Sequence, residues 1–173
     1  MNVKRLLLVA AATLALAVLS PTGAGAFDRP VTQLDCTFEV HLAFNPGISP
    51  AMEAIRITST APGPLSCQGT WAGHPVTGQG LVTFEGDAVG NCAGSTIDAV
   101  VRLVHPLVGG GRMELEVPFR SGRAGMALYG QGSDPARPAS LVGTGTPDAG
   151  QDCRQVPITG IGARGRAVFG PWR

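Results

Sequence analysis

Residues 97–119 read IDAVVRLVHPLVGGGRMELEVPF, two runs of alternating side chains divided by a proline and three glycines. Every second residue of the later run is apolar: Met113, Leu115, Val117 and Phe119. A period of two places such side chains on one face of a strand. Residues 97–104 alternate in a matching way, and His105-Pro106 with glycines 109–111 separates the two runs. The stretch therefore predicts a β-hairpin whose apolar face needs a second apolar surface to cover it.

The rest of the chain repeats this pattern in short runs divided by glycine and proline. Further strands are predicted at residues 34–42, 55–60, 65–71, 81–89, 125–130, 139–146 and, as one or two strands, 153–169. Asn45-Pro46-Gly47 is expected to end the first strand, and Ser49-Pro50 to begin a brief helical turn through Glu53. No apolar pattern of helical period lasts long enough for a substantial helix. We therefore predict an all-β fold, a single small antiparallel β-barrel or β-sandwich with little or no helix outside the signal peptide.

The first 26 residues have the pattern of a secretory signal peptide. Lys4 and Arg5 precede an apolar run at residues 6–19, and Ala24-Gly25-Ala26 supplies a small-residue cleavage site. The apolar run is shorter than the roughly 20 residues of a spanning helix, so a retained membrane anchor is disfavoured. Residues 27–173 are then expected to form one secreted domain with no membrane span.

Four cysteines, Cys36, Cys67, Cys92 and Cys153, remain in this mature chain. An even number in an exported protein favours two disulfides. A zinc site is the alternative, but the chain has no C-x-x-C pair. Three pairings are possible, and we prefer Cys67–Cys92 with Cys36–Cys153, because the second bridge would tie the first strand to one of the last.

Charge gives little indication of a partner. The formal net charge is +1, and the only lysine, Lys4, belongs to the signal peptide. A nearly neutral mature chain has no electrostatic footprint for nucleic acid or for an anionic membrane.

The mature chain resembles a group of small exported actinobacterial proteins of unknown function. The resemblance rests on the signal peptide, on Cys36 at the start of a strand that runs into residues 42–46, and on Cys67 after a proline-glycine turn. It also rests on glycines that lead to Gly90-Asn91-Cys92, and on Cys153 before a final glycine-rich strand; residues 124–152 fit least well. The resemblance implies a disulfide-stabilised, β-barrel-like domain, and it carries over no catalytic residue.

Several motifs suggest chemistry, but each has a simpler interpretation. Residues 160–165 spell GxGxxG, yet a dinucleotide site needs a helix there and an acidic residue about 20 positions later. His41, His74 and His105 stand in separate segments, so we expect solvated or turn histidines rather than metal ligands. Glu114 and Glu116 share one face of their strand, which we expect to be solvated. We therefore predict no catalytic residue, no metal site and no cofactor.

Aromatic residues give the best candidates for binding. Trp71 lies beside the glycine- and proline-rich loop 72–80, at a barrel mouth where it would contact a small apolar ligand or plug the core. We take Trp71, His74 and Tyr129 as candidate ligand-binding residues. Phe169 and Trp172 are expected to pack against the core rather than to bind a polyanion with the C-terminal arginines.

Three classes of function fit these observations. We favour a non-enzymatic secreted domain that binds a small apolar ligand or an extracellular protein. An enzyme of small-barrel type, such as a cyclase or isomerase, would need polar groups that converge inside the barrel. An extracellular inhibitor or structural protein would use exposed loops, with residues 72–80 and 133–138 as candidates.

Overall fold

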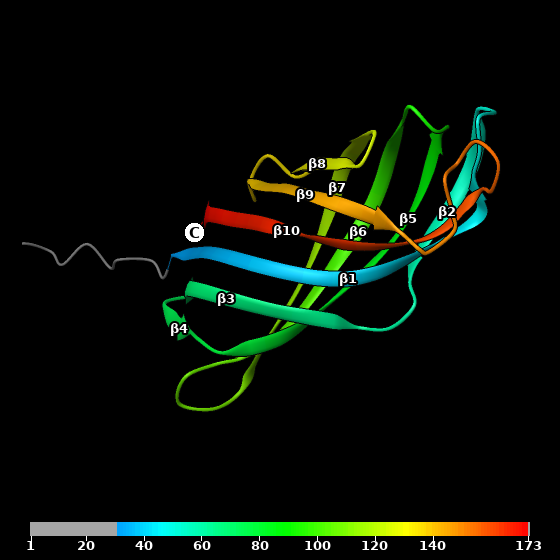
Figure 1. Ribbon diagram of the computed structural model, residues 1–173. Coiled ribbons are helices and arrows are strands. Elements are labelled where there is room, and N and C mark those ends of the chain that lie inside the picture. Colours follow the sequence, from blue (N-terminus) through cyan, green and yellow to red (C-terminus); the bar gives the residue numbers. More distant parts are fainter. Residues whose placement is uncertain (1–30, 173) are drawn as a thin grey trace, which may run out of the picture.

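The computed structural model describes residues 31–172, and these form ten strands and no helix (Figure 1). The predicted signal peptide, residues 1–26, lies outside the described residues. The strands are β1 (Thr32–Ile48), β2 (Glu53–Ser59), β3 (Gly63–Trp71), β4 (His74–Val76), β5 (Gln79–Gly90), β6 (Gly94–Pro106), β7 (Arg112–Ala124), β8 (Ala127–Gly132), β9 (Ala139–Pro147) and β10 (Ile158–Trp172). The predicted all-β fold is confirmed.

All ten strands belong to one antiparallel sheet, and this sheet closes on itself. The sheet runs from β10 through β9, β8, β7, β6, β5 and β2 to β1, and β10 also pairs with β1. β2 and β3 follow one another along the same side of β1, and both also pair with β5. The result is a closed but irregular barrel, to which β4 adds a short hairpin (Figure 1).

The hairpin predicted from residues 97–119 is β6 and β7. Val101 lies opposite Val117 and Leu103 opposite Leu115, without a register shift over the whole pair. The four alternating apolar side chains of β7 are all buried. They meet inward-facing residues of the opposite wall, where Phe119 contacts Phe169 edge to face with ring centroids 6.2 Å apart. The hairpin thus finds its second surface in β10.

The outer face carries ion pairs between neighbouring strands. Arg56 on β2 binds Glu85 and Asp87 on β5, and Arg102 on β6 lies between Glu85 and Glu116 on β7. These side chains are all well exposed, so each pair adds little to stability. Their position confirms that Glu116 faces solvent.

Strand β1 closes the barrel and is longer than predicted. It continues through Asn45-Pro46-Gly47 to Ile48, and the expected helical turn after it is a bend. The register of β1 against β10 shifts between Ala43 and Ile48. This irregularity leaves Pro46 opposite no partner, so its missing N–H costs no ladder bond. The prediction that this turn sequence ends the strand is therefore wrong.

The two disulfides are Cys36–Cys67 and Cys92–Cys153, so the preferred pairing is wrong. Cys36 lies directly opposite Cys67 in the β1–β3 register, with Cα atoms 4.1 Å apart. Cys153 cannot reach Cys36, because its Sγ lies 3.4 Å from the carbonyl oxygen of Ile48, at the far end of β1. The last strand needs no bridge to the first, since a long hydrogen-bonded ladder already joins them. Two disulfides are typical of an oxidising environment.

The first and last described strands run antiparallel, with Thr32 opposite Trp172. Both ends of residues 31–172 consequently lie at the same end of the barrel (Figure 1). This part of the chain contains no helix that is long and apolar enough to cross a membrane.

Candidate ligand site inside the barrel

The barrel interior contains two adjoining cavities. Their volumes are about 50 and 20 Å³, and Leu42, Ile57, Ile97 and Leu128 line both of them. Ile97 and Leu128 are only partly buried, which places this wall of the cavities close to the surface. The larger cavity also touches Phe84 and Leu141. An interior with an apolar lining and unfilled volume can take up a small apolar guest.

The cavities exist because the side chains around them are too small to fill the interior. The inward positions around the cavities include Ala88 on β5 and Ser95, Ala99 and Ser121 on the β6–β7 hairpin. At the other end of the same hairpin the inward positions carry leucine, methionine and phenylalanine, which fill the core. Side-chain size along one hairpin therefore decides which end of the barrel is packed and which end is hollow.

Arg123 lies at the hollow end. It continues the inward-facing series of β7 beyond Phe119 and Ser121, and it is only 3% exposed. Its guanidinium donates hydrogen bonds to the carbonyl oxygens of Gly125 at 2.5 Å, of Cys92 at 3.3 Å and of Asn91. Burial lowers the pKa of this guanidinium, but an arginine stays charged in a folded protein. The described part of the chain offers Arg123 no carboxylate, and its Nε has no hydrogen-bond partner.

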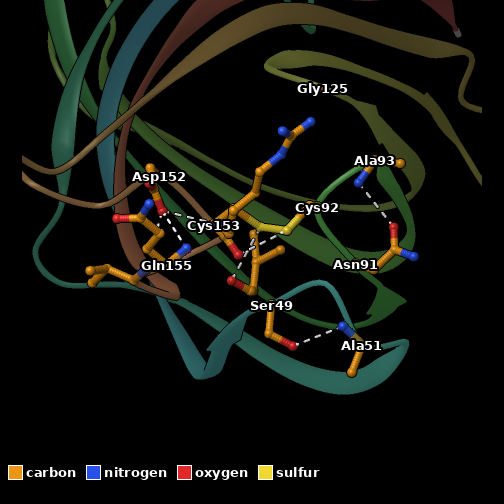
Figure 2. Close-up of a disulfide and its surroundings, with 12 residues drawn as sticks. Ser49, Ala51, Asn91, Cys92, Ala93, Gly125, Asp152, Cys153 and Gln155 are labelled. Carbon is orange, nitrogen blue, oxygen red and sulfur yellow. Dashed lines mark hydrogen bonds between the residues drawn. A yellow bond between two sulfur atoms is a disulfide. The ribbon is translucent and has the colours of Figure 1, made fainter.

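The Cys92–Cys153 disulfide (Figure 2) lies at the same end of the barrel, since the carbonyl oxygen of Cys92 accepts a hydrogen bond from Arg123. It joins the β5–β6 turn to the loop between β9 and β10. On the Cys92 side, the side chain of Asn91 accepts a hydrogen bond from the N–H of Ala93 at 3.0 Å. The N–H of Cys92 donates to the carbonyl of Ser49 at 2.9 Å. These bonds hold the carbonyl groups that Arg123 contacts in a fixed arrangement.

On the Cys153 side, Asp152 organises the loop. Its Oδ1 accepts hydrogen bonds from the N–H groups of Arg154, Gln155 and Val156 at 2.7–3.1 Å. These bonds, those from Val156 and Gln155 above all, hold the pKa of Asp152 below its ordinary value. The loop therefore has its own polar scaffold.

The outer surface carries more open hollows, in which charged and polar side chains stand among apolar ones. One of about 490 Å³ lies over β2, β5 and β6, beside Arg56, Asp87 and Asp98. Arg56 and Asp87 already form an ion pair with each other, so neither charge is free to bind a ligand in this hollow.

The three predicted ligand-binding residues lie in two places. Trp71 and His74 are cross-strand partners in the β3–β4 hairpin, with Trp71 half-buried against the core and His74 exposed. Neither lines the two interior cavities. Tyr129 lies on β8, which pairs with β7 and β9 and not with β3 or β4, and it lines the larger cavity. Its ring covers Gly122, where a Cβ would come within 2.5 Å of the tyrosine Cζ.

The histidines also differ in their surroundings. His41 is exposed, as expected, and its Nε2 lies 2.8 Å from Oδ1 of Asp148. His105 was expected in a turn but is fully buried on β6, with its ring nitrogens facing the carbonyls of Pro106 and Gly78. It is buried because the strand continues past the predicted turn and keeps its inward alternation. Residues 31–172 contain no group of three or more histidine, cysteine or carboxylate side chains able to hold a metal ion.

The other sequence motifs have structural positions. The GxGxxG segment lies within β10, in a strand rather than at the start of a helix. Phe169 is fully buried and contacts Trp172 edge to face, so the prediction that both pack against the core is confirmed.

Arg123 was not singled out from the sequence. The alternation that begins at Met113 reaches it if continued past Phe119, which is the only sequence signal for its inward position. Gly122 and Ala124 beside it hide that signal, because they are neither clearly polar nor large.

Comparison with protein-family models, with curated proteins and with solved structures finds no match to this chain.

Proposed function

We propose that this protein is a secreted, non-enzymatic binding protein that holds a small apolar ligand inside its barrel. The observation that carries the proposal is the pair of adjoining interior cavities with an almost entirely apolar lining. Apolar cavities stay dry and gain free energy when a matching apolar molecule fills them. The two disulfides and the signal-peptide pattern support an extracellular site of action.

The size of the cavities limits the ligand. Since one water needs about 10–15 Å³ of such space, cavities of 50 and 20 Å³ suit a molecule of a few non-hydrogen atoms. Leu128 lines both cavities and is partly exposed, so a change of its rotamer would join them and admit a guest from the surface. Tyr129, which was predicted to contact a ligand, lines the same wall.

The proposal is tested by titrating the protein with isobutanol and benzene and recording methyl NMR spectra. We expect saturable shifts for the methyl groups of Leu42, Ile57, Ile97 and Leu128. Ala99→Leu, which fills the larger cavity, should abolish these shifts, and Ala127→Leu, at an exposed position of β8, should leave them unchanged. Saturable shifts that persist in Ala99→Leu, or the absence of any shift in the wild type, would overturn the proposal.

A further inference from the structure

A buried cation without a counter-ion is the most unusual feature of the interior. Among residues 31–172, the guanidinium of Arg123 donates hydrogen bonds only to neutral carbonyl oxygens, those of Asn91, Cys92 and Gly125. Its Nε–H is buried and donates to nothing in the described chain. Burial of a charge without an opposite charge, and of a donor without an acceptor, costs free energy. A ligand that supplies both the charge and the acceptor would recover that cost.

Arg123 lines the smaller cavity, so its side chain borders the space in which a ligand would bind, and a small adjustment of that side chain would present its unpaired Nε–H to the ligand. Ser95, its direct partner across the β6–β7 ladder, lines the same cavity. Every other side chain around this cavity is aliphatic or aromatic. The two polar side chains are therefore neighbours in a space that is otherwise apolar, and this space adjoins the larger cavity at Leu42 and Leu128.

On the strength of the proposed function, we infer that the ligand is a small carboxylate with a branched or short apolar body. Its carboxylate pairs with Arg123, and its apolar part extends past Leu128 into the larger cavity. A carboxylate fits better than a neutral carbonyl compound, because the carbonyl accepts the Nε–H but leaves the guanidinium charge uncompensated. A carboxylate also has a smaller head group than a phosphate or sulfate monoester, which suits the smaller of the two cavities.

Two probes of nearly equal shape separate charge from size: isobutyrate and isobutyramide, titrated at neutral pH. We expect isobutyrate to bind at least about tenfold more tightly, as for other hydrogen bonds between ionised groups. We also expect the Nε–Hε resonance of Arg123 to shift on addition of isobutyrate. Equal affinities, or an Arg123 resonance that isobutyrate does not move, would overturn the carboxylate inference.

Variants assign the preference to Arg123. Arg123→Met should bind both probes with equal affinity, and Arg123→Lys should keep part of the preference. Arg120→Met removes an exposed arginine of the same strand and should keep it fully. If Arg123→Met does not fold, the lysine variant and the wild-type resonance still decide the question.

The outcomes separate the two proposals. If both probes and isobutanol shift the cavity methyl groups equally, the ligand site stands and the carboxylate preference fails. If neither the probes nor isobutanol and benzene shift those groups, the ligand site fails as well. Preference for isobutyrate that survives unchanged in Arg123→Met would place the anion elsewhere and overturn the assignment.

Discussion

Arg123 also has a structural consequence that can be measured without a ligand. It satisfies carbonyl groups of the β5–β6 turn and of Gly125, beside the Cys92–Cys153 disulfide. Removal of a charged donor from several buried acceptors should lower the free energy of unfolding by about 2–3 kcal/mol. Arg123→Met is therefore expected to unfold at a lower urea concentration than the wild type, while Arg120→Met should keep the wild-type midpoint. Equal midpoints for the two variants would contradict this role.

Tyr129 and Gly122 form a second pair at the residue scale. The ring covers the glycine across the β7–β8 ladder, and a Cβ on residue 122 would lie 2.5 Å from the tyrosine Cζ. Gly122→Ala should therefore destabilise the wild type more than it destabilises a Tyr129→Ala background. A double-mutant cycle in urea should give a coupling of about 1 kcal/mol, as is usual for side chains in contact. Additive effects would show that the ring moves aside at no cost.

At the scale of strands and loops, the two disulfides should act differently. They close segments of 31 and 61 residues, so chain entropy assigns each about 4 kcal/mol of stability. Cys36–Cys67 lies within a hydrogen-bonded ladder that holds β1 and β3 together without it. Cys92–Cys153 joins two loops that no ladder connects. Loss of the second bridge should therefore open its surroundings locally.

Hydrogen exchange measured by mass spectrometry tests this difference. In Cys92→Ala/Cys153→Ala we expect faster exchange in residues 90–94 and 148–157 than elsewhere. In Cys36→Ala/Cys67→Ala the increase should spread over the whole sheet. A uniform increase of the exchange rate in both variants would show that the Cys92–Cys153 disulfide does not stabilise its two loops locally.

A strand can be predicted from the sequence when the residues that determine it lie close together in the chain. The β6–β7 hairpin is predictable because the alternation of Met113 to Phe119 is local and each apolar side chain has a polar neighbour. The continuation of β1 through Pro46 is not, because it depends on a register shift against β10, more than a hundred residues away. The disulfide pairing depends on a different register, that of β1 with β3, which places Cys36 opposite Cys67.

The candidate site was harder to predict than the fold. A cavity depends on the combined volume of side chains from several strands, and no single stretch carries that information. Ala88, Ser95 and Ala99 are unremarkable in the sequence, and their common position appears only when β5 and β6 pair. Tyr129 belongs to the wall of the larger cavity, whereas Trp71 and His74 lie in a different hairpin, so the sequence did not show which of the three lie together.

At the scale of the whole molecule, the pairing of β1 with β10 closes the barrel. The stability that an ion pair across this seam contributes should depend on pH. Arg166 on β10 binds both carboxylate oxygens of Asp35 on β1, which holds the pKa of Asp35 below its ordinary value of about 3.9. The folded protein therefore binds fewer protons than the unfolded chain near that pH. This contribution to stability is fully present above about pH 4 and is lost as the pH falls through the lowered pKa.

Asp35→Asn and Arg166→Met should flatten the fall in stability below about pH 4 to the same extent. The double variant should add nothing to either single change, because both remove one interaction. The midpoint of urea unfolding measured from pH 2 to pH 7 checks this. A steeper acid dependence in Arg166→Met than in Asp35→Asn would indicate that Asp35 has a second cationic partner.

The antiparallel seam that brings Thr32 opposite Trp172 also has a practical consequence for protein engineering. A host protein could accept residues 31–172 as a cassette within one of its surface loops, since entry and exit points adjoin. Such an insertion would keep the two parts of the host chain close together, and it would couple the ligand binding that we propose for the barrel to a reporter built around it.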